Sequence, residues 1–118
     1  MGHSLGAHVI LSTIKNLAKN TKNKGIIEAV YLFGGSIPSD ALSAKNASYV
    51  QKIVSKKIRN YYSPHDEVLH VVDDWNWVDT PIGYKGAHGK TIPKYSQTMV
   101  KPKNHRFVSY AAVLRSFP

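Results

Sequence analysis

The sequence predicts an α/β fold, a three-layer sandwich fragment in which a mainly parallel sheet of about three strands is flanked by helices. Segments with helical spacing of apolar residues alternate with short apolar runs rich in β-branched and aromatic residues. The chain has 118 residues, of which 42% are hydrophobic. This length and composition suit one globular domain, which we assign to residues 1–118.

The first third of the chain predicts a helix followed by a buried strand. Apolar residues recur every three or four positions from Leu5 to Ala18, which indicates one helical face. The polar stretch KNTKNKG follows, and its last residue, Gly25, is typical of a helix terminator. The run IIEAVYLFGG is almost continuously apolar, as expected for a strand covered on both faces.

The remaining segments continue this alternation. A helix capped by Ser39 or Asp40 is predicted to run to Val54. The run KKIRNYY then predicts a strand that ends at Ser63, because the following proline disfavours helical geometry there. The later predictions are a short helix at 66–75, an irregular connection at 76–90, a third strand at 91–100 with edge character from its proline, and a terminal helix at 105–117.

The composition excludes several classes of site and location. With no cysteine, the chain forms no disulfide, thiolate metal site or cysteine nucleophile. No apolar run approaches the roughly 18 residues of a membrane span, and the first residues lack the layout of a secretion signal. We therefore expect no transmembrane segment and a cytoplasmic location.

The net charge of +9 raises the question of an acidic partner. The lysines are spread along the whole chain, and there are only three arginines, at positions 59, 106 and 115. This distribution is typical of a solvated surface, so nucleic acid is not the expected partner. A basic protein that binds nucleic acid or an anionic membrane is kept as a third hypothesis.

The segment Gly2-His3-Ser4-Leu5-Gly6 has the Gly-x-Ser-x-Gly pattern and leads directly into the first predicted helix. The pattern alone is weakly specific, and a helix-capping serine is the ordinary alternative. A serine at a helix start, however, faces free N–H groups that stabilise an oxyanion. We expect both glycines to leave space for a tight turn around Ser4.

A nucleophilic serine needs a histidine base, and the histidine needs an acid that orients it. In sheet-topped serine hydrolases the chain order is Ser, Asp or Glu, then His. Asp66 follows the predicted strand KKIRNYY, and His105 precedes the terminal helix. The alternative acids are Asp40, Glu67, Asp73 and Asp74, and the alternative base is His88 in the segment YKGAHGK.

The other histidines do not predict a metal centre. His3 and His8 flank the serine, and His65 and His70 are five residues apart, which places them on different faces of a helix. No His-Glu-x-x-His pattern completes a ligand set, so we expect no metal. Trp75 and Trp77 are predicted to pack in the core or a lid, with an acyl-binding surface as the alternative.

The segments GHSLGAHVI, VYLFGGSIPSD, RNYYSPHDEVL and NHRFVSY together resemble the α/β-hydrolase superfamily, and most of all its hydrolase-like domains of the transmembrane-and-coiled-coil-domain type. The resemblance covers nearly the whole chain. It implies Ser4 as nucleophile, Asp66 as acid, His105 as base, the Leu5 N–H as an oxyanion donor, and no cofactor. It further implies a hydrolase of ester or lipid-like small molecules.

The resemblance begins at the serine turn, whereas complete α/β-hydrolases have several strands before it. We therefore expect the chain to represent the C-terminal half of that fold, truncated and without the second oxyanion donor, with reduced or no activity alone. Loss of one such donor costs about 100- to 1000-fold in turnover. The alternative is a non-catalytic remnant or interaction module that pairs with another protein, or with itself, through an exposed sheet edge.

Overall fold

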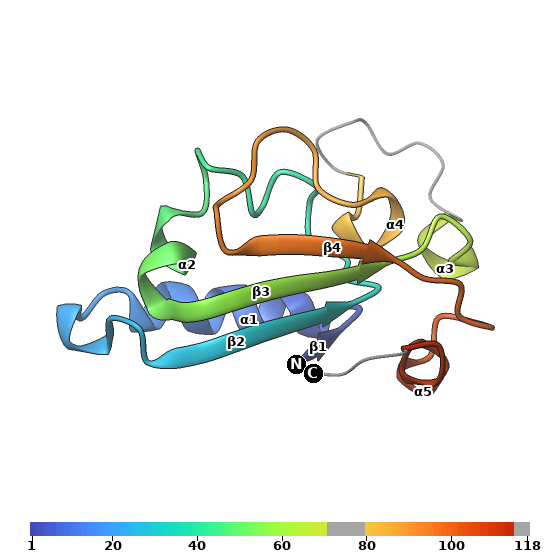
Figure 1. Ribbon diagram of the computed structural model, residues 1–118, viewed down its shortest axis with the longest axis horizontal. Helices are drawn as coiled ribbons and strands as arrows, with labels where there is room; N and C mark the ends of the chain where they lie inside the picture. The colour runs from blue at the N-terminus through green and yellow to red at the C-terminus, as the bar shows by residue number, and fades with distance from the viewer. Residues whose placement is uncertain (71–79, 115–118) are drawn as a thin grey trace.

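A computed structural model, which describes residues 1–70 and 80–114, confirms the predicted α/β architecture. Its four-stranded sheet has the order β1-β2-β3-β4, with strands at Gly2–His3, Ile27–Phe33, Val54–Tyr62 and Tyr95–Met99. All three strand pairs are parallel. The carboxyl ends of the strands therefore meet at one end of the sheet, where the arrowheads point in Figure 1.

The helices lie between and beyond these strands. They are α1 (Gly6–Leu17), α2 (Ser48–Ile53), α3 (Glu67–His70), α4 (Ile82–Lys85) and α5 (Phe107–Ala112). In Figure 1, α1 runs behind the sheet, while α3 and α5 lie beyond its carboxyl end. A short 3-10 turn at Thr21–Asn23 follows α1. Gly25, just before β2, has a φ of +69°, so the predicted terminator glycine adopts the left-handed conformation.

Two local predictions differ from the structure. The sheet has a fourth strand, β1, whose two residues pair with Leu32 and Phe33 and are too few to produce a recognisable period. The helix predicted from Ser39 or Asp40 begins only at Ser48. The preceding segment forms turns instead, in which the Asn46 side chain donates to the Asp40 carbonyl.

Two further segments also depart from expectation. The connection predicted to be irregular at 76–90 contains α4 at its centre. The helix predicted at 66–75 is present as α3, and residues 71–79, with Trp75 and Trp77, lie outside the described residues. The terminal helix is shorter than predicted within the described range, because α5 ends at Ala112.

One face of the sheet is closed by the main hydrophobic core. Strand residues that alternate toward this face meet apolar residues of α1 and α2, and each of these side chains is at most 5% exposed: Val30, Leu32, Ile58, Ala7, Ile14, Val50 and Ile53. At about 25 cal/mol per Å² of buried apolar surface, this packing is the main stabilising contribution. It holds α1 firmly against the sheet.

The opposite face is covered mainly near the carboxyl ends of the strands. There Phe33, Tyr61 and Val100 pack with Tyr110 of α5, and the Phe33 and Tyr61 rings stack with centroids 5.1 Å apart. Beside this cluster a hollow of about 420 Å³ is lined in part by Arg59 and Lys101. The aromatic cluster therefore fixes α5, and with it the end of the sheet, while the rest of this face is more open.

One sheet edge is only partly paired among the described residues. Because β1 has two residues, it covers Leu32 and Phe33, and within the described ranges residues 27–30 have no strand neighbour on that side. An apolar groove beside this stretch is lined in part by Val9 and Ile10 of α1. No helix within the described ranges has the length and apolar character needed to cross a membrane.

Candidate active site

The parallel sheet brings three loops together at its carboxyl end. Ser4 directly follows β1, Asp66 lies beyond β3, and His105 lies between β4 and α5. These residues are far apart in sequence, but the loops that follow parallel strands open at the same end of the sheet (Figure 1). The architecture therefore places the three predicted side chains in one region.

Ser4 occupies a strained turn between β1 and α1. Its φ is +53°, and it is the only non-glycine with positive φ among the described residues. The Ser4 N–H donates to the Phe33 carbonyl at 3.1 Å, and the Ser4 carbonyl accepts from the N–H of Ser36 at 3.2 Å. These bonds tie the turn to the end of β2. A left-handed serine between a strand and a helix is the backbone arrangement of a nucleophile elbow.

Ser4, His105 and Asp66 form a continuous chain of hydrogen bonds. Ser4 Oγ lies 2.7 Å from His105 Nε2, and His105 Nδ1 lies 2.5 Å from Asp66 Oδ2. Since an ionised carboxylate only accepts hydrogen bonds, the proton on His105 resides at Nδ1, and Nε2 accepts from the Ser4 hydroxyl. In this tautomer the histidine is positioned to take the serine proton.

The Asp66 carboxylate accepts four hydrogen bonds from described residues, although Asp66 is only 1% exposed. Its Oδ1 accepts from the backbone N–H groups of Val68 at 3.1 Å and Leu69 at 3.2 Å, at the start of α3. Its Oδ2 accepts from His105 and from the hydroxyl of Tyr110, which lies 2.5 Å away. A carboxylate this deeply buried requires such partners, so its orientation is fixed from three sides.

Two residues make contacts with this arrangement that the sequence does not predict. Tyr110 was placed only on the apolar face of the terminal helix, and burial together with the bond to Asp66 raises the pKa of its hydroxyl. His3 donates from Nε2 to the backbone carbonyl of His105, and their ring centroids are 4.8 Å apart. The position of His3 next to Ser4 was the one available indication of such a role.

The alternative residues lie elsewhere. His88 is exposed, and its backbone N–H donates to the Ser39 carbonyl at 3.0 Å. The Asp40 carboxylate accepts from Asn46 at 3.3 Å, and Glu67 is exposed on α3. The remaining alternative acids, Asp73 and Asp74, lie outside the described residues. The structure thus places His105, rather than His88, beside Ser4.

The two glycines of the Gly-x-Ser-x-Gly pattern are not equivalent. A Cβ built on Gly2 would lie 2.4 Å from Ile10 Cδ1 and 3.1 Å from the Gly6 backbone, so this position is crowded. A Cβ on Gly6 would meet nothing within 4 Å. The expectation that both glycines leave space for the turn is therefore correct only for Gly2.

The start of α1 supplies N–H groups close to Ser4. The first hydrogen bonds of this turn are donated by Ala7 to Ser4 and by His8 to Leu5. The Leu5 N–H therefore comes before the helical bonding pattern begins, as the first N–H groups of a helix do. This geometry suits the predicted oxyanion donor.

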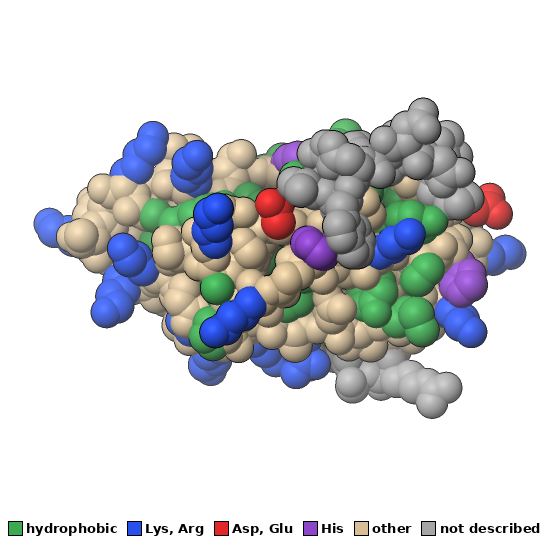
Figure 2. Space-filling model, turned by 90° about the horizontal axis from the view of Figure 1, so that it is seen from above, with side chains coloured by type: hydrophobic (Ala, Val, Ile, Leu, Met, Phe, Trp, Pro, Cys, Tyr) green, Lys and Arg blue, Asp and Glu red, His purple; other side chains and the backbone are tan. Residues whose placement is uncertain are grey.

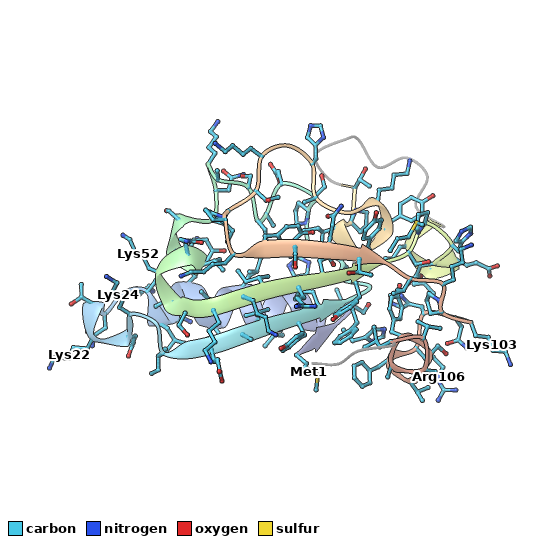
Figure 3. All side chains as sticks on the ribbon, in the orientation of Figure 1. Met1, Lys22, Lys24, Lys52, Lys103 and Arg106 are labelled. Carbon is cyan, nitrogen blue, oxygen red and sulfur yellow. The ribbon has the colours of Figure 1, made fainter. Side chains whose placement is uncertain are left out.

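The described basic side chains are spread over the molecule rather than gathered at one place (Figure 2 and Figure 3). Figure 3 shows Lys22, Lys24 and Lys52 at the amino end of the strands and Lys103 and Arg106 at the opposite end. In the view of Figure 2 the basic side chains are likewise spread over the molecule. No three His, Asp or Glu side chains within residues 1–70 and 80–114 are grouped so that they could hold a metal ion.

Comparison with known proteins places the chain in a family. Residues 1–81 match the family model described as "Protein of unknown function (DUF726)", which covers Ser4 and Asp66. A curated relative is the "Transmembrane and coiled-coil domain-containing protein STS1" of Oryza sativa subsp. japonica, 32% identical over 71 residues. That alignment covers 60% of this chain and 10% of the relative, so the chain spans about a tenth of the relative's length. No solved structure matches.

Proposed function

We propose that this chain, which belongs to the DUF726 family, is a serine hydrolase that acts on ester or lipid-like substrates. The observation that carries the proposal is the hydrogen-bonded chain from Ser4 through His105 to the buried Asp66, with spacings of 2.7 and 2.5 Å. The positive φ of Ser4 supports the same conclusion, because strained backbone is maintained where it positions a reactive group.

The geometry suits an acyl-enzyme mechanism. Ser4 Oγ attacks the ester carbonyl carbon while His105 Nε2 takes the hydroxyl proton, and Asp66 stabilises the resulting imidazolium. The Leu5 N–H donates to the oxyanion of the tetrahedral intermediate. His105 then returns the proton to the leaving alcohol, leaving an ester on Ser4. A water deprotonated by His105 attacks this ester, and its collapse releases the acid and restores Ser4. No cofactor takes part.

Apolar side chains beside each of the three residues support an ester with hydrocarbon groups. Leu5 follows Ser4 and is 71% exposed, Val68 lies two residues beyond Asp66, and Phe107 two residues beyond His105. Val68 is 56% exposed and Phe107 is 41% exposed, so these side chains are accessible to the hydrocarbon group of a substrate. This arrangement favours an acyl or alkyl chain over a charged substrate.

Hydrolysis of about three p-nitrophenyl esters, with acyl chains from about two to about eight carbons, tests this proposal. We expect turnover that Ser4→Ala and His105→Ala reduce by at least about 1000-fold. His88→Ala is the matched control, because it removes an exposed histidine and is expected to leave turnover unchanged. Turnover that survives Ser4→Ala would contradict the assignment.

A second candidate function is an interaction module that pairs through the β2 edge. Residues 27–30 lack a strand neighbour on one side within the described residues, and an apolar groove with Val9 and Ile10 lies beside them. An open edge of this kind is a template for an added strand. Self-association weakened by Ala29→Pro, which removes a backbone donor, would support it; a monomer at high concentration would count against self-pairing.

A further inference from the structure

We propose that Tyr110 is a positioning residue that acts through Asp66, sharing the charge of the carboxylate with His105. The inference deepens the proposed function and rests on it. Tyr110 is fully buried, and its hydroxyl donates to Oδ2 of Asp66 at 2.5 Å. The same oxygen accepts from His105 Nδ1. One donor just before α5 and one within α5 therefore converge on one carboxylate oxygen.

The hydroxyl of Tyr110 is suited to act only as a donor. Burial raises its pKa, and the bond to Asp66 raises it further, so the hydroxyl keeps its proton throughout the neutral range. The other oxygen of Asp66 already accepts from the N–H groups of Val68 and Leu69. Among the described residues, Tyr110 therefore provides the one side-chain bond, other than that of His105, that fixes where Oδ2 points.

The backbone of a distant loop leaves space for this hydroxyl. Gly34, directly after β2, has φ of +53°, and a Cβ built there would lie 2.8 Å from the Tyr110 hydroxyl. A side chain at this position would both strain the backbone and displace the hydroxyl. The ring of Tyr110 is held separately, by packing against Phe33, Tyr61 and Val100. The contributions of the ring and the hydroxyl can therefore be separated by experiment.

The hydroxyl should change how readily His105 takes up a proton. A donor on Oδ2 disperses the carboxylate charge, so less of it stabilises an imidazolium on His105. Without the hydroxyl, the protonated histidine would be stabilised more, and His105 would titrate at higher pH. In the part of the chain that the structure describes, the groups that face His105 are Ser4 and His3 from the β1 region, Asp66 beyond β3, and Tyr110 from α5. Only the last is altered in the test.

The experiment is an NMR titration of the His105 imidazole in the unmodified chain and in Tyr110→Phe. We expect the midpoint to rise by about half a pH unit in the variant, because only part of the energy of a charged hydrogen bond differs between the two charge states of His105. Tyr61→Phe is the matched control, because Tyr61 lies in the same aromatic cluster and its buried hydroxyl has no hydrogen-bond partner among the described residues. The control should leave the midpoint unchanged.

An unchanged midpoint in a folded Tyr110→Phe would overturn the inference, as would an equal shift in Tyr61→Phe. If Tyr110→Phe does not fold, a measurement on the unmodified chain still tests the inference. A slowly exchanging Tyr110 hydroxyl proton with a nuclear Overhauser effect to the His105 Nδ1 proton is expected, and its absence contradicts the inference. Neither measurement depends on turnover. The ester assay can therefore fail, which refutes the proposed function, while the titration separately supports or refutes the link through Asp66.

Discussion

The two faces of the sheet differ in how completely they are covered, and neighbouring residues of β3 show the difference. Ile58 points into the main core and is fully buried, whereas Lys57, one position earlier, lies partly exposed with its Nζ 5.7 Å from the Tyr31 ring centroid. The covered face holds α1, which carries Ser4 at its start, and the opposite face holds α5, which carries Tyr110. The candidate site therefore depends on packing from both faces of the sheet.

The largest effect is expected for Ile58→Ala, which empties a fully buried position on the covered face. Removal of a large aliphatic side chain from a core typically costs about 3 to 4 kcal/mol of unfolding free energy. Lys57→Ala on the same strand should change it by only about 0.5 kcal/mol. Urea unfolding of both variants measures the contrast. Equal losses in the two variants would show that the faces do not differ as described.

A smaller but still large effect is expected for Gly83→Ala. A Cβ at this position in α4 would lie 2.2 Å from the Gly35 nitrogen and 2.3 Å from the Gly34 carbonyl carbon, so backbone must move. We expect a loss of about 2 to 3 kcal/mol in unfolding free energy. Gly6→Ala, with nothing within 4 Å of its Cβ, is the matched control and should be neutral or slightly stabilising. Thermal unfolding that does not separate the two variants would refute the close approach of α4.

A gradual effect is expected at alkaline pH. Burial raises the pKa of Tyr95 and of Tyr110 above the ordinary value of about 10. As pH rises, the unfolded chain loses these protons before the folded chain does. The two tyrosines therefore contribute fully to the free energy of unfolding below about pH 10, the unfolded pKa, and their contribution declines as pH rises above it. For each tyrosine, the free energy of unfolding should fall by up to about 1.4 kcal/mol per pH unit. Urea unfolding should be measured at about pH 9 and about pH 11, one unit either side of the ordinary tyrosine pKa. The free energy of unfolding should fall less between these two pH values in Tyr95→Phe than in the unmodified chain, and an equal fall would contradict this prediction.

Much of the fold follows from the sequence because it is local and periodic. The amphipathic spacing of α1 and the continuous apolar run of β2 predicted both elements close to their observed bounds. The turns at 37–47 were harder to predict. There the Ser43 hydroxyl accepts from the Asn46 N–H, and the Asn46 side chain donates to the carbonyl and the carboxylate of Asp40. These side chains stabilise turns instead of capping a helix, and this competition is not apparent from apolar spacing.

The candidate site also has a part that the sequence predicts and a part that it does not. Chain order and the positions after predicted strands were enough to select Ser4, Asp66 and His105, and the structure brings these side chains together, although their chemical roles stay a prediction. The contacts of Tyr110 with Asp66 and of His3 with His105 join residues 44 and 102 positions apart. They result from how α5 packs on the sheet, which no local pattern reveals.

The most direct test of the account is labelling of the folded chain with a fluorophosphonate probe, with the adduct mapped by mass spectrometry. The probe reacts with a serine only when a base activates it. We predict a single adduct on Ser4 that is abolished in Ser4→Ala and in His105→Ala and retained in His88→Ala. No adduct in a sample shown to be folded, or an adduct on another serine, would contradict the claim that Ser4, His105 and Asp66 form a working hydrolytic centre.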